Sequence, residues 1–172
     1  MRYILYSLLL VASISCKKEY GSNPELSKLP AATRIGANTC GCLVNGKAWV
    51  MNPVGPNAYA AENIGPTFFF YLNGPDSSYL YFALRGYSPA VKRTFNIHNS
   101  MGWSSFYING LGYGSYENPE NSGTINFTRF DTVNKIMSGS FSFSYKSPTG
   151  NQQSYPDQIL TDCRFDVRYK KL

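Results

Sequence analysis

The chain has 172 residues and a formal charge of +6, with 15% charged and 16% aromatic residues. This length suits one domain, and the scattered placement of the basic residues argues against nucleic-acid binding. Tyrosine and phenylalanine favour pleated, half-buried positions, so the 14 Tyr and 11 Phe residues favour β structure.

The first predicted element is a short apolar segment at residues 4–14, shortly before Cys16. With Arg2 ahead of it, the segment has the form of a signal peptide. It is too short to cross a bilayer as a helix, which needs about 20 residues. Ser15 supplies a small side chain at the cleavage position, and the site resembles the lipobox of bacterial lipoproteins, with Ser13 where leucine is commoner. An ordinary secretory signal or an uncleaved anchor is the alternative.

We therefore expect residues 1–15 to be removed as a lipoprotein signal peptide and Cys16 to carry the lipid. Two or three acyl chains give stable membrane attachment, whereas one chain gives marginal attachment. No aspartate follows Cys16, so the resemblance implies the outer membrane, on its periplasmic or its surface face. Residues 16–38 are polar and rich in Pro, Gly and Ser, which predicts a flexible tether, and residues 39–172 are the predicted all-β domain.

The domain begins with a predicted hairpin that joins residues 39–44 to residues 47–50. Its turn is Asn45-Gly46, and this dipeptide suits a type I′ turn because both positions tolerate positive φ. A loop or lid is predicted at residues 53–66.

The rest of the domain is predicted to be short strands separated by turns. The strand at residues 78–85 has apolar residues on both faces, which predicts a central strand. The strand at residues 135–145 alternates serine with aromatic residues, as is typical of an antiparallel strand with one wet face. The other predicted strands cover residues 67–73, 93–97, 104–109, 112–116, 123–131 and 159–169. We thus predict an antiparallel β-sandwich, with a closed antiparallel β-barrel as the alternative, and little or no helix.

Three segments resemble an uncharacterised lipoprotein family of the Bacteroidetes, a domain of unknown function. They are TRIGANTCGCLVNGKAW at 33–49, SGSFSF at 138–143 and TDCRFDVRY at 161–169. The resemblance covers about residues 30–169. Its motifs are turn and core motifs, so it implies the address and the β fold and no activity. Members of the family often have Phe in place of Cys40 and Gly in place of Cys163.

Three cysteines besides Cys16 are expected in the domain, and one disulfide is predicted between its first and last strands. We favour Cys40–Cys163, because both positions depart together from the pattern of the resembling family. Cys42–Cys163 is the rival pair. Cys40–Cys42 is disfavoured because residues two apart on a strand have Cα atoms about 6.5–7 Å apart, near the geometric limit. Three buried free thiols are the alternative.

The candidate ligand-binding residues are aromatic side chains in a Gly/Ser-rich, irregular segment. Their rings suit stacking on sugars or holding a peptide, and the alternative is ordinary packing in the β core. They are Trp103, Phe106, Tyr107, Tyr113 and Tyr116.

The sequence predicts no catalytic residue, metal site or cofactor. Its single histidine, His98, lies outside any nucleophile motif. Asp162 and Asp166 alternate with arginines on the wet face of the last strand, which predicts a surface charge ladder.

We therefore expect a non-catalytic binding or envelope-structural module anchored to the outer membrane by its N-terminal lipid. Its partners are the membrane and a glycan or an envelope protein, with no nucleic acid. A glycan-acting hydrolase and a small-lipid carrier are the alternative functions.

Overall fold

The computed structural model describes residues 23–53, 60–85, 94–97, 102–114, 120–147 and 156–172. These residues form an all-β fold, which confirms the predicted class, and their one helix is the three-residue 3₁₀ turn η1, Leu26–Lys28. The strands are β1 (Thr39–Val44), β2 (Lys47–Val50), β3 (Ala61–Ile64), β4 (Thr67–Asn73), β5 (Tyr79–Arg85), β6 (Thr94–Ile97), β7 (Gly102–Ile108), β8 (Leu111–Gly114), β9 (Ser122–Asp131), β10 (Ile136–Tyr145) and β11 (Gln158–Lys171).

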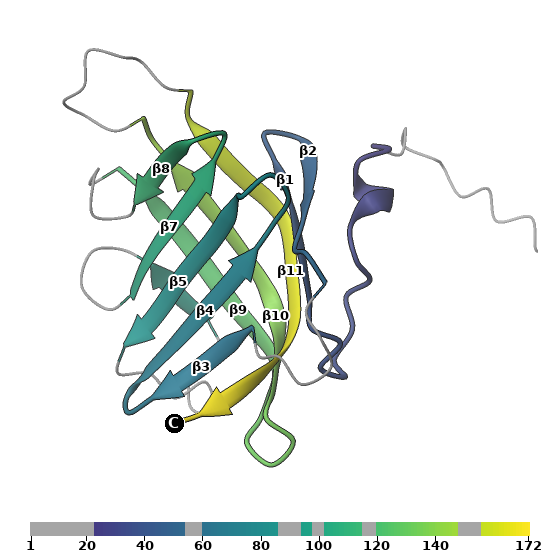
Figure 1. Ribbon diagram of the computed structural model, residues 1–172, viewed down its shortest axis with the longest axis vertical. Coiled ribbons are helices and arrows are strands. Elements are labelled where there is room, and N and C mark those ends of the chain that lie inside the picture. The colour runs from purple at the N-terminus through teal and green to yellow at the C-terminus, as the bar shows by residue number, and fades with distance from the viewer. Residues whose placement is uncertain (1–22, 54–59, 86–93, 98–101, 115–119, 148–155) are drawn as a thin grey trace, which may run out of the picture.

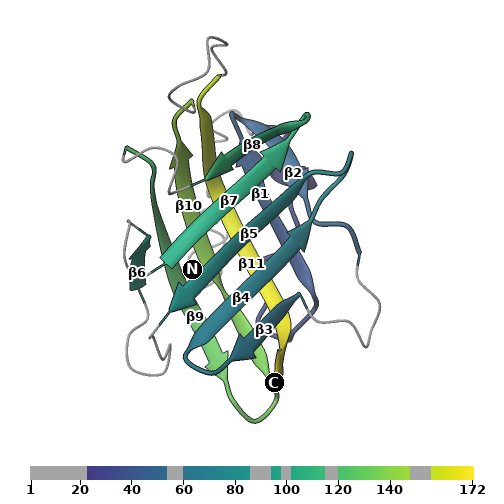
Figure 2. The same cartoon turned by 60° about the vertical axis from the view of Figure 1, so that its left-hand side comes forward.

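All of these strands belong to one curled sheet with the order β6-β9-β10-β11-β3-β4-β5-β7-β8, and β1 and β2 extend from β11 (Figure 1). β11 joins the two layers. It pairs antiparallel with β10 and β1 along most of its length, and its C-terminal end pairs in parallel with β3. Figure 2 shows the two layers crossing over the core. The sheet is therefore an open half-barrel. The layers face each other as in the predicted sandwich, but they are continuous, and the barrel of the alternative prediction is not closed.

Aromatic rings from both layers fill the interior of the half-barrel. The Phe70 and Phe82 rings stack with their centroids 4.1 Å apart. Phe82 also meets Phe141 of the opposite layer at 5.7 Å, and Phe70 meets Phe165 at 5.7 Å. Burial of these rings is the main favourable contribution to folding, at roughly 25 cal/mol per Å² of apolar surface removed from water.

Local sequence patterns predict most strand positions correctly. The hairpin of β1 and β2 matches its predicted bounds, and its turn has φ of 49° at Asn45 and 82° at Gly46, as a type I′ turn requires. The predicted loop at residues 53–66 is partly wrong, because Ala61–Ile64 forms β3 at the C-terminal end of β11. The parallel pairing of β3 with β11 joins distant parts of the chain, so no local pattern indicates it, whereas the two-residue turn Gly65-Pro66 between β3 and β4 is a local hairpin signal.

A β-bulge at Asp162 divides β11 into two stretches. Asp162 has φ of 51°, and the registers with β1 and β10 both shift opposite this position. Leu160 and Cys163 therefore both face the core, although they are three residues apart. The bulge preserves an inward apolar face on each side of the irregularity.

The segment predicted as the end of a flexible tether is instead docked on the sheet. We call residues 23–38 the strap. Near its start, the backbone N–H of Ala48 donates to the Glu25 carboxylate at 2.8 Å, and Leu29 is buried. Pro30 then covers Gly41, where a Cβ atom would lie 2.6 Å from the proline Cδ. A tether, if present, is limited to residues before 23, which lie outside the described residues.

The strap ends on Asp166, which is 1% exposed and therefore does not belong to a surface charge ladder. Its carboxylate accepts hydrogen bonds from the Thr33 and Ser138 hydroxyls at 2.5 and 2.7 Å. It also accepts from backbone N–H groups of residues 35, 36 and 37. Burial opposes ionisation of Asp166, but the Thr33, Ser138 and backbone donors outweigh it and hold the pKa below its ordinary value.

Candidate functional site

The outer face of β4, β5 and β7 carries a group of aromatic side chains that no described element covers. Large aromatic rings on paired strands usually lie on the side that faces the core. Tyr71 and Tyr79 lie on the opposite side, and each is 41% exposed. The other members are half-buried on the same face. We call this group the aromatic platform, and its members are Phe69, Tyr71, Tyr79, Tyr81 and Tyr107.

Strand alternation and register bring these rings together. Tyr71 of β4 lies opposite Tyr81 of β5, with ring centroids 5.0 Å apart. Tyr79 of β5 lies opposite Tyr107 of β7, with centroids 5.2 Å apart and planes within 7° of parallel. Phe69 lies 6.3 Å from Tyr81. Because each ring stands on a paired strand, the platform is rigid before any ligand arrives.

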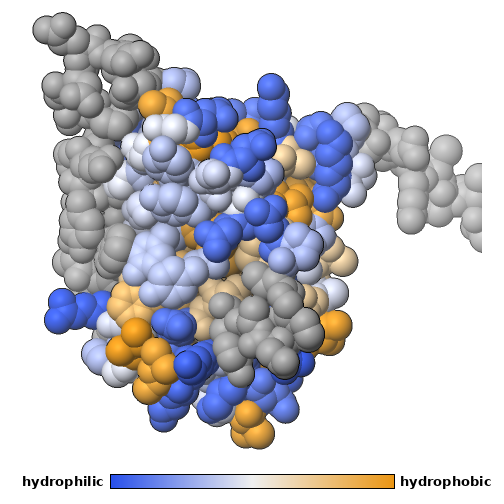
Figure 3. All heavy atoms as spheres, in the orientation of Figure 1, coloured by the Kyte–Doolittle hydropathy of each residue, from blue (hydrophilic) through white to orange (hydrophobic). Residues whose placement is uncertain are grey.

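A shallow pocket of about 410 Å³ lies on this face. Its volume is in the range of small-molecule sites. Ser105 on β7 lies opposite Tyr81, and Gly112 on β8 lies opposite Tyr107, so the platform borders small residues. The tyrosine rings therefore stand beside residues with little or no side chain. Figure 3 shows residues of intermediate hydropathy, in pale colours, on the face turned toward the reader. The pocket is lined by Tyr71, Leu72, Asn73, Tyr79, Leu80, Tyr81 and Ser105.

The turn between β4 and β5 fixes the spacing of the platform, and Trp49 of β2 supports that turn. The indole Nε1–H donates to the Ser78 hydroxyl at 2.8 Å. Gly74 packs directly on the indole, where a Cβ atom would lie only 2.4 Å from Trp49 Cε2. A glycine is therefore required at this position, and the hairpin that carries Tyr71 and Tyr79 is held in register from below.

The chemistry of the platform is apolar with neutral hydroxyl groups. Burial is the first cause that raises the pKa of Tyr81, followed by the electrostatic effect of the Tyr71 phenol and then by a hydrogen bond with it. The phenol of Tyr81 is therefore protonated at neutral pH and can donate as well as accept. The described lining of the pocket contains no carboxylate, so it offers stacking surface and hydrogen bonds but no acid–base pair.

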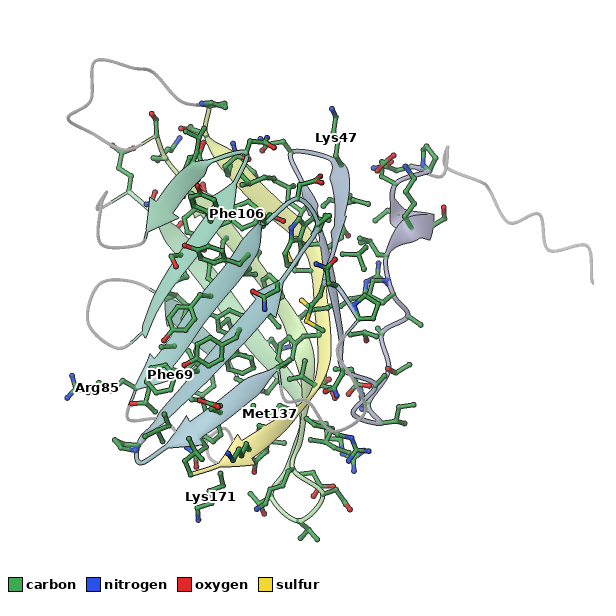
Figure 4. The ribbon with its side chains drawn as sticks, viewed as in Figure 1. Lys47, Phe69, Arg85, Phe106, Met137 and Lys171 are labelled. Atoms are coloured by element: carbon green, nitrogen blue, oxygen red, sulfur yellow. The ribbon has the colours of Figure 1, made fainter. Side chains whose placement is uncertain are left out.

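The five candidate ligand-binding residues do not form one surface. Phe106 is buried against Trp49 with ring centroids 6.1 Å apart, and Tyr113 is buried with its hydroxyl donating to the Pro156 carbonyl at 3.0 Å. These two rings belong to the core, because strand alternation in β7 and β8 turns them inward. Figure 4 labels Phe106 together with Phe69 of the platform.

Of the remaining candidates, only Tyr107 is placed on the platform. The backbone of Trp103 pairs with Ala83 in β7, and its side chain lies outside what the structure describes. Tyr116, His98 and the predicted lipid site Cys16 also lie outside the described ranges.

The disulfide predicted between β1 and β11 is not formed, and Cys40, Cys42 and Cys163 are buried free thiols. The β1–β11 register places Cys40 opposite Phe165, so the favoured pair is not in register. Burial raises the pKa of Cys163, and the adjacent Cys42 thiol raises it further. The Cys163 thiol lies 3.4 Å from the Thr161 carbonyl oxygen, to which it donates. These thiols are core groups of low reactivity.

Sequence reasoning missed four of the five platform residues. The two apolar faces of residues 78–85 predict a central strand, which is confirmed because β5 pairs with both β4 and β7, but that prediction does not distinguish a covered face from an uncovered one. A more specific signal is present, because one face carries aliphatic residues and Phe82, whereas the other carries Tyr79 and Tyr81. Tyrosine has an apolar ring and a polar tip, so it suits a face that is half in water.

Neither a family model nor a curated protein nor a solved structure matches this chain. Within the described ranges, no helix has the length and apolar character needed to cross a membrane.

Proposed function

We propose that the protein is a lipid-anchored, non-catalytic glycan-binding module of the cell envelope. The observation that carries this proposal is the uncovered aromatic platform on β4, β5 and β7. Pyranose rings have apolar C–H faces edged by hydroxyl groups. An array of tyrosine rings matches both parts, because the rings pack on the C–H faces and the phenol groups bind the hydroxyls.

The surroundings of the platform support binding over hydrolysis. A glycosidase needs two carboxyl groups on either side of the scissile bond, about 5 to 9.5 Å apart. The described lining of the platform pocket has none. The Asp166 carboxylate is occupied by its hydrogen bonds to the strap. Asp162 is exposed, but it lies on β11 and not on a strand of the platform.

The filled interior gives no support to the small-lipid carrier. A carrier needs an apolar cavity, whereas in the described core Phe70 contacts both Phe82 and Phe165. The envelope address rests on the signal-like residues 4–14 and on Cys16, and it is proposed from the sequence.

The test is a glycan array probed with the mature chain carrying Cys16→Ser, followed by calorimetry on the best ligand. We expect Tyr81→Ala to weaken binding about tenfold or more, because it removes the ring that contacts both Phe69 and Tyr71. Tyr79→Phe keeps the ring and is the matched control for stacking, so its loss is expected to be smaller. The proposal fails if the parent chain binds no glycan, or if Tyr81→Ala binds as well as the parent.

A further inference from the structure

The end of the molecule at the C-terminus of β11 carries four aliphatic side chains that are unusually exposed. Their exposed fractions are 66% for Ile35, 44% for Ile64, 85% for Val133 and 59% for Leu172. Ile35 lies in the strap and Val133 in the turn between β9 and β10. Single exposed aliphatic residues are common, but four at one end of a half-barrel form a set.

Strand pairing places these residues around the end of β11. Leu172 donates its backbone N–H to the Asn63 carbonyl at 3.0 Å, next to Ile64. The turn that carries Val133 precedes Ile136, which lies opposite Arg168 of β11. The strap is held at the same level by Asp166. Figure 1 shows the C-terminus, the β9–β10 turn and the β3–β4 turn at the lower end.

Exposed cations surround these aliphatic side chains. Arg168 follows the strap-binding residue Asp166 on β11, and Arg85 of β5 lies opposite Thr67, the partner of Ile64. Figure 4 labels Lys171 at this end and Lys47 at the other, and hydrophobic and hydrophilic residues mix at the lower end of Figure 3. The exposed cations are Arg34, Arg85, Arg168, Lys170 and Lys171.

The carboxylates at this end neutralise only part of that charge. Asp131 is paired with the half-buried Arg129 at 2.5 Å and also accepts from the turn residues Val133 and Asn134. Its pKa is held below the ordinary value by Asn134 first and then by Arg129. Among the described residues at this end, Asp131 is satisfied internally and Asp166 is buried, which leaves Glu62 to balance the five exposed cations.

We propose that this basic–apolar end, comprising these four aliphatic residues and five cations, binds the surface of an anionic lipid bilayer. Aliphatic tips enter the boundary between headgroups and acyl chains, and the flanking cations meet lipid phosphates. A soluble polyanion would satisfy the cations, but it offers nothing to Val133 or Ile35. The aliphatic exposure is therefore what favours a lipid surface.

This end lies far from the proposed lipid anchor. The strap begins beside Ala48. Ala48 pairs with Leu43 of β1, which in turn pairs with Thr161 of β11. Along β11, Thr161 lies about 33 Å from Lys171, at 3.3 Å per residue. Seven residues from Cys16 to Asn23 reach about 23 Å. The anchored end and the basic–apolar end are thus distinct, and the latter is free to meet a second lipid surface. The inference does not depend on glycan binding by the platform.

The test is vesicle co-sedimentation of the mature chain carrying Cys16→Ser, which cannot be acylated. We expect binding to vesicles of equimolar phosphatidylcholine and phosphatidylglycerol, and at least about tenfold weaker binding to pure phosphatidylcholine. The double variant Lys170→Glu/Lys171→Glu and the single variant Val133→Ser should each weaken binding to the anionic vesicles. Lys47→Glu and Ile159→Ser are matched controls because both residues are exposed outside this end.

Three results would overturn the proposal. The first is that the protein does not bind anionic vesicles, and the second is that the control variants lose as much binding as the test variants. The third is that the protein binds soluble polyphosphate and that Val133→Ser changes neither polyphosphate binding nor vesicle binding. The last result would assign the cations to a soluble polyanion. Thermal unfolding of each variant separates loss of binding from loss of fold, since all substituted side chains are exposed.

Discussion

The backbone N–H of Gly36 donates a hydrogen bond of 2.8 Å to the buried carboxylate of Asp166, 130 positions later in the chain. Gly36 has φ of +74°, and a Cβ atom there would lie 2.9 Å from Ile136 Cγ1. The strap can therefore turn over the sheet only with glycine at this position. This contact therefore attaches the first described segment of the chain to the last strand of the sheet.

Asp166→Asn should lower the free energy of unfolding by about 3 kcal/mol, because asparagine keeps one acceptor oxygen but loses the charge, and a hydrogen bond to a charged group contributes about 1.5–3 kcal/mol. Asp162→Asn is the control on the same strand. Asp162 is exposed, and asparagine tolerates its positive φ, so that change should stay within about 0.5 kcal/mol. Urea unfolding of the two variants measures the difference. Equal effects would mean that the strap is not held by this carboxylate.

The same carboxylate predicts a pH dependence of stability. Its folded pKa lies below the ordinary value of about 3.9, so the unfolded chain binds a proton more readily than the folded chain. The contribution of Asp166 is therefore complete above about pH 5 and is lost as the pH falls through about 3.9 toward the folded pKa. Urea unfolding across this range should show the gap between the parent and Asp166→Asn narrowing in acid. A gap that stays constant contradicts the assignment.

The buried thiols predict a specific labelling pattern. Burial raises the pKa of Cys40 and Cys163, so little reactive thiolate forms in the folded protein. In the Cys16→Ser chain, iodoacetamide should label none of the three core cysteines in the native state and all three in guanidinium without reductant. Mass spectrometry counts the labels. Only one label after unfolding would instead reveal a disulfide.

Neighbouring residues of β7 should respond differently to truncation. Phe106→Ala should cost about 3–5 kcal/mol of stability, because its ring is fully buried in the core. Tyr107→Ala should cost about 1 kcal/mol or less, because Tyr107 is half-buried on the platform beside Tyr79. Thermal unfolding compares the two. A reversed order would show that the two faces of β7 are assigned wrongly.

The lipid anchor predicts a change of location. Cys16→Ser removes the acylation site, so the protein should lose lipid labelling and leave the membrane fraction or stay unprocessed. Cys42→Ser tests whether any cysteine change has this effect, and it should keep the label. Metabolic labelling with a fatty acid followed by fractionation measures both. Persistent labelling of Cys16→Ser would rule out this anchor.

Local pattern was sufficient for most of the strands in this chain. Asn45-Gly46 determined a type I′ hairpin, and the alternation of serine with Phe141, Phe143 and Tyr145 determined which face of β10 is inward. These features depend on neighbours within a few residues, so backbone sterics and period-two burial are enough to predict them.

The sequence by itself therefore determined the all-β class, the hairpins and the signal-like start. The tertiary structure decided that the sheet curls through β11 without closing and that Asp166 is buried under the strap. It also decided that Tyr71, Tyr79 and Tyr81 face outward, whereas Phe106 faces inward. The physical reason is that burial depends on what covers a face, and the covering segments lie far away in the chain. An amphipathic tyrosine fits either a core or a surface, and only the completed sheet distinguishes them.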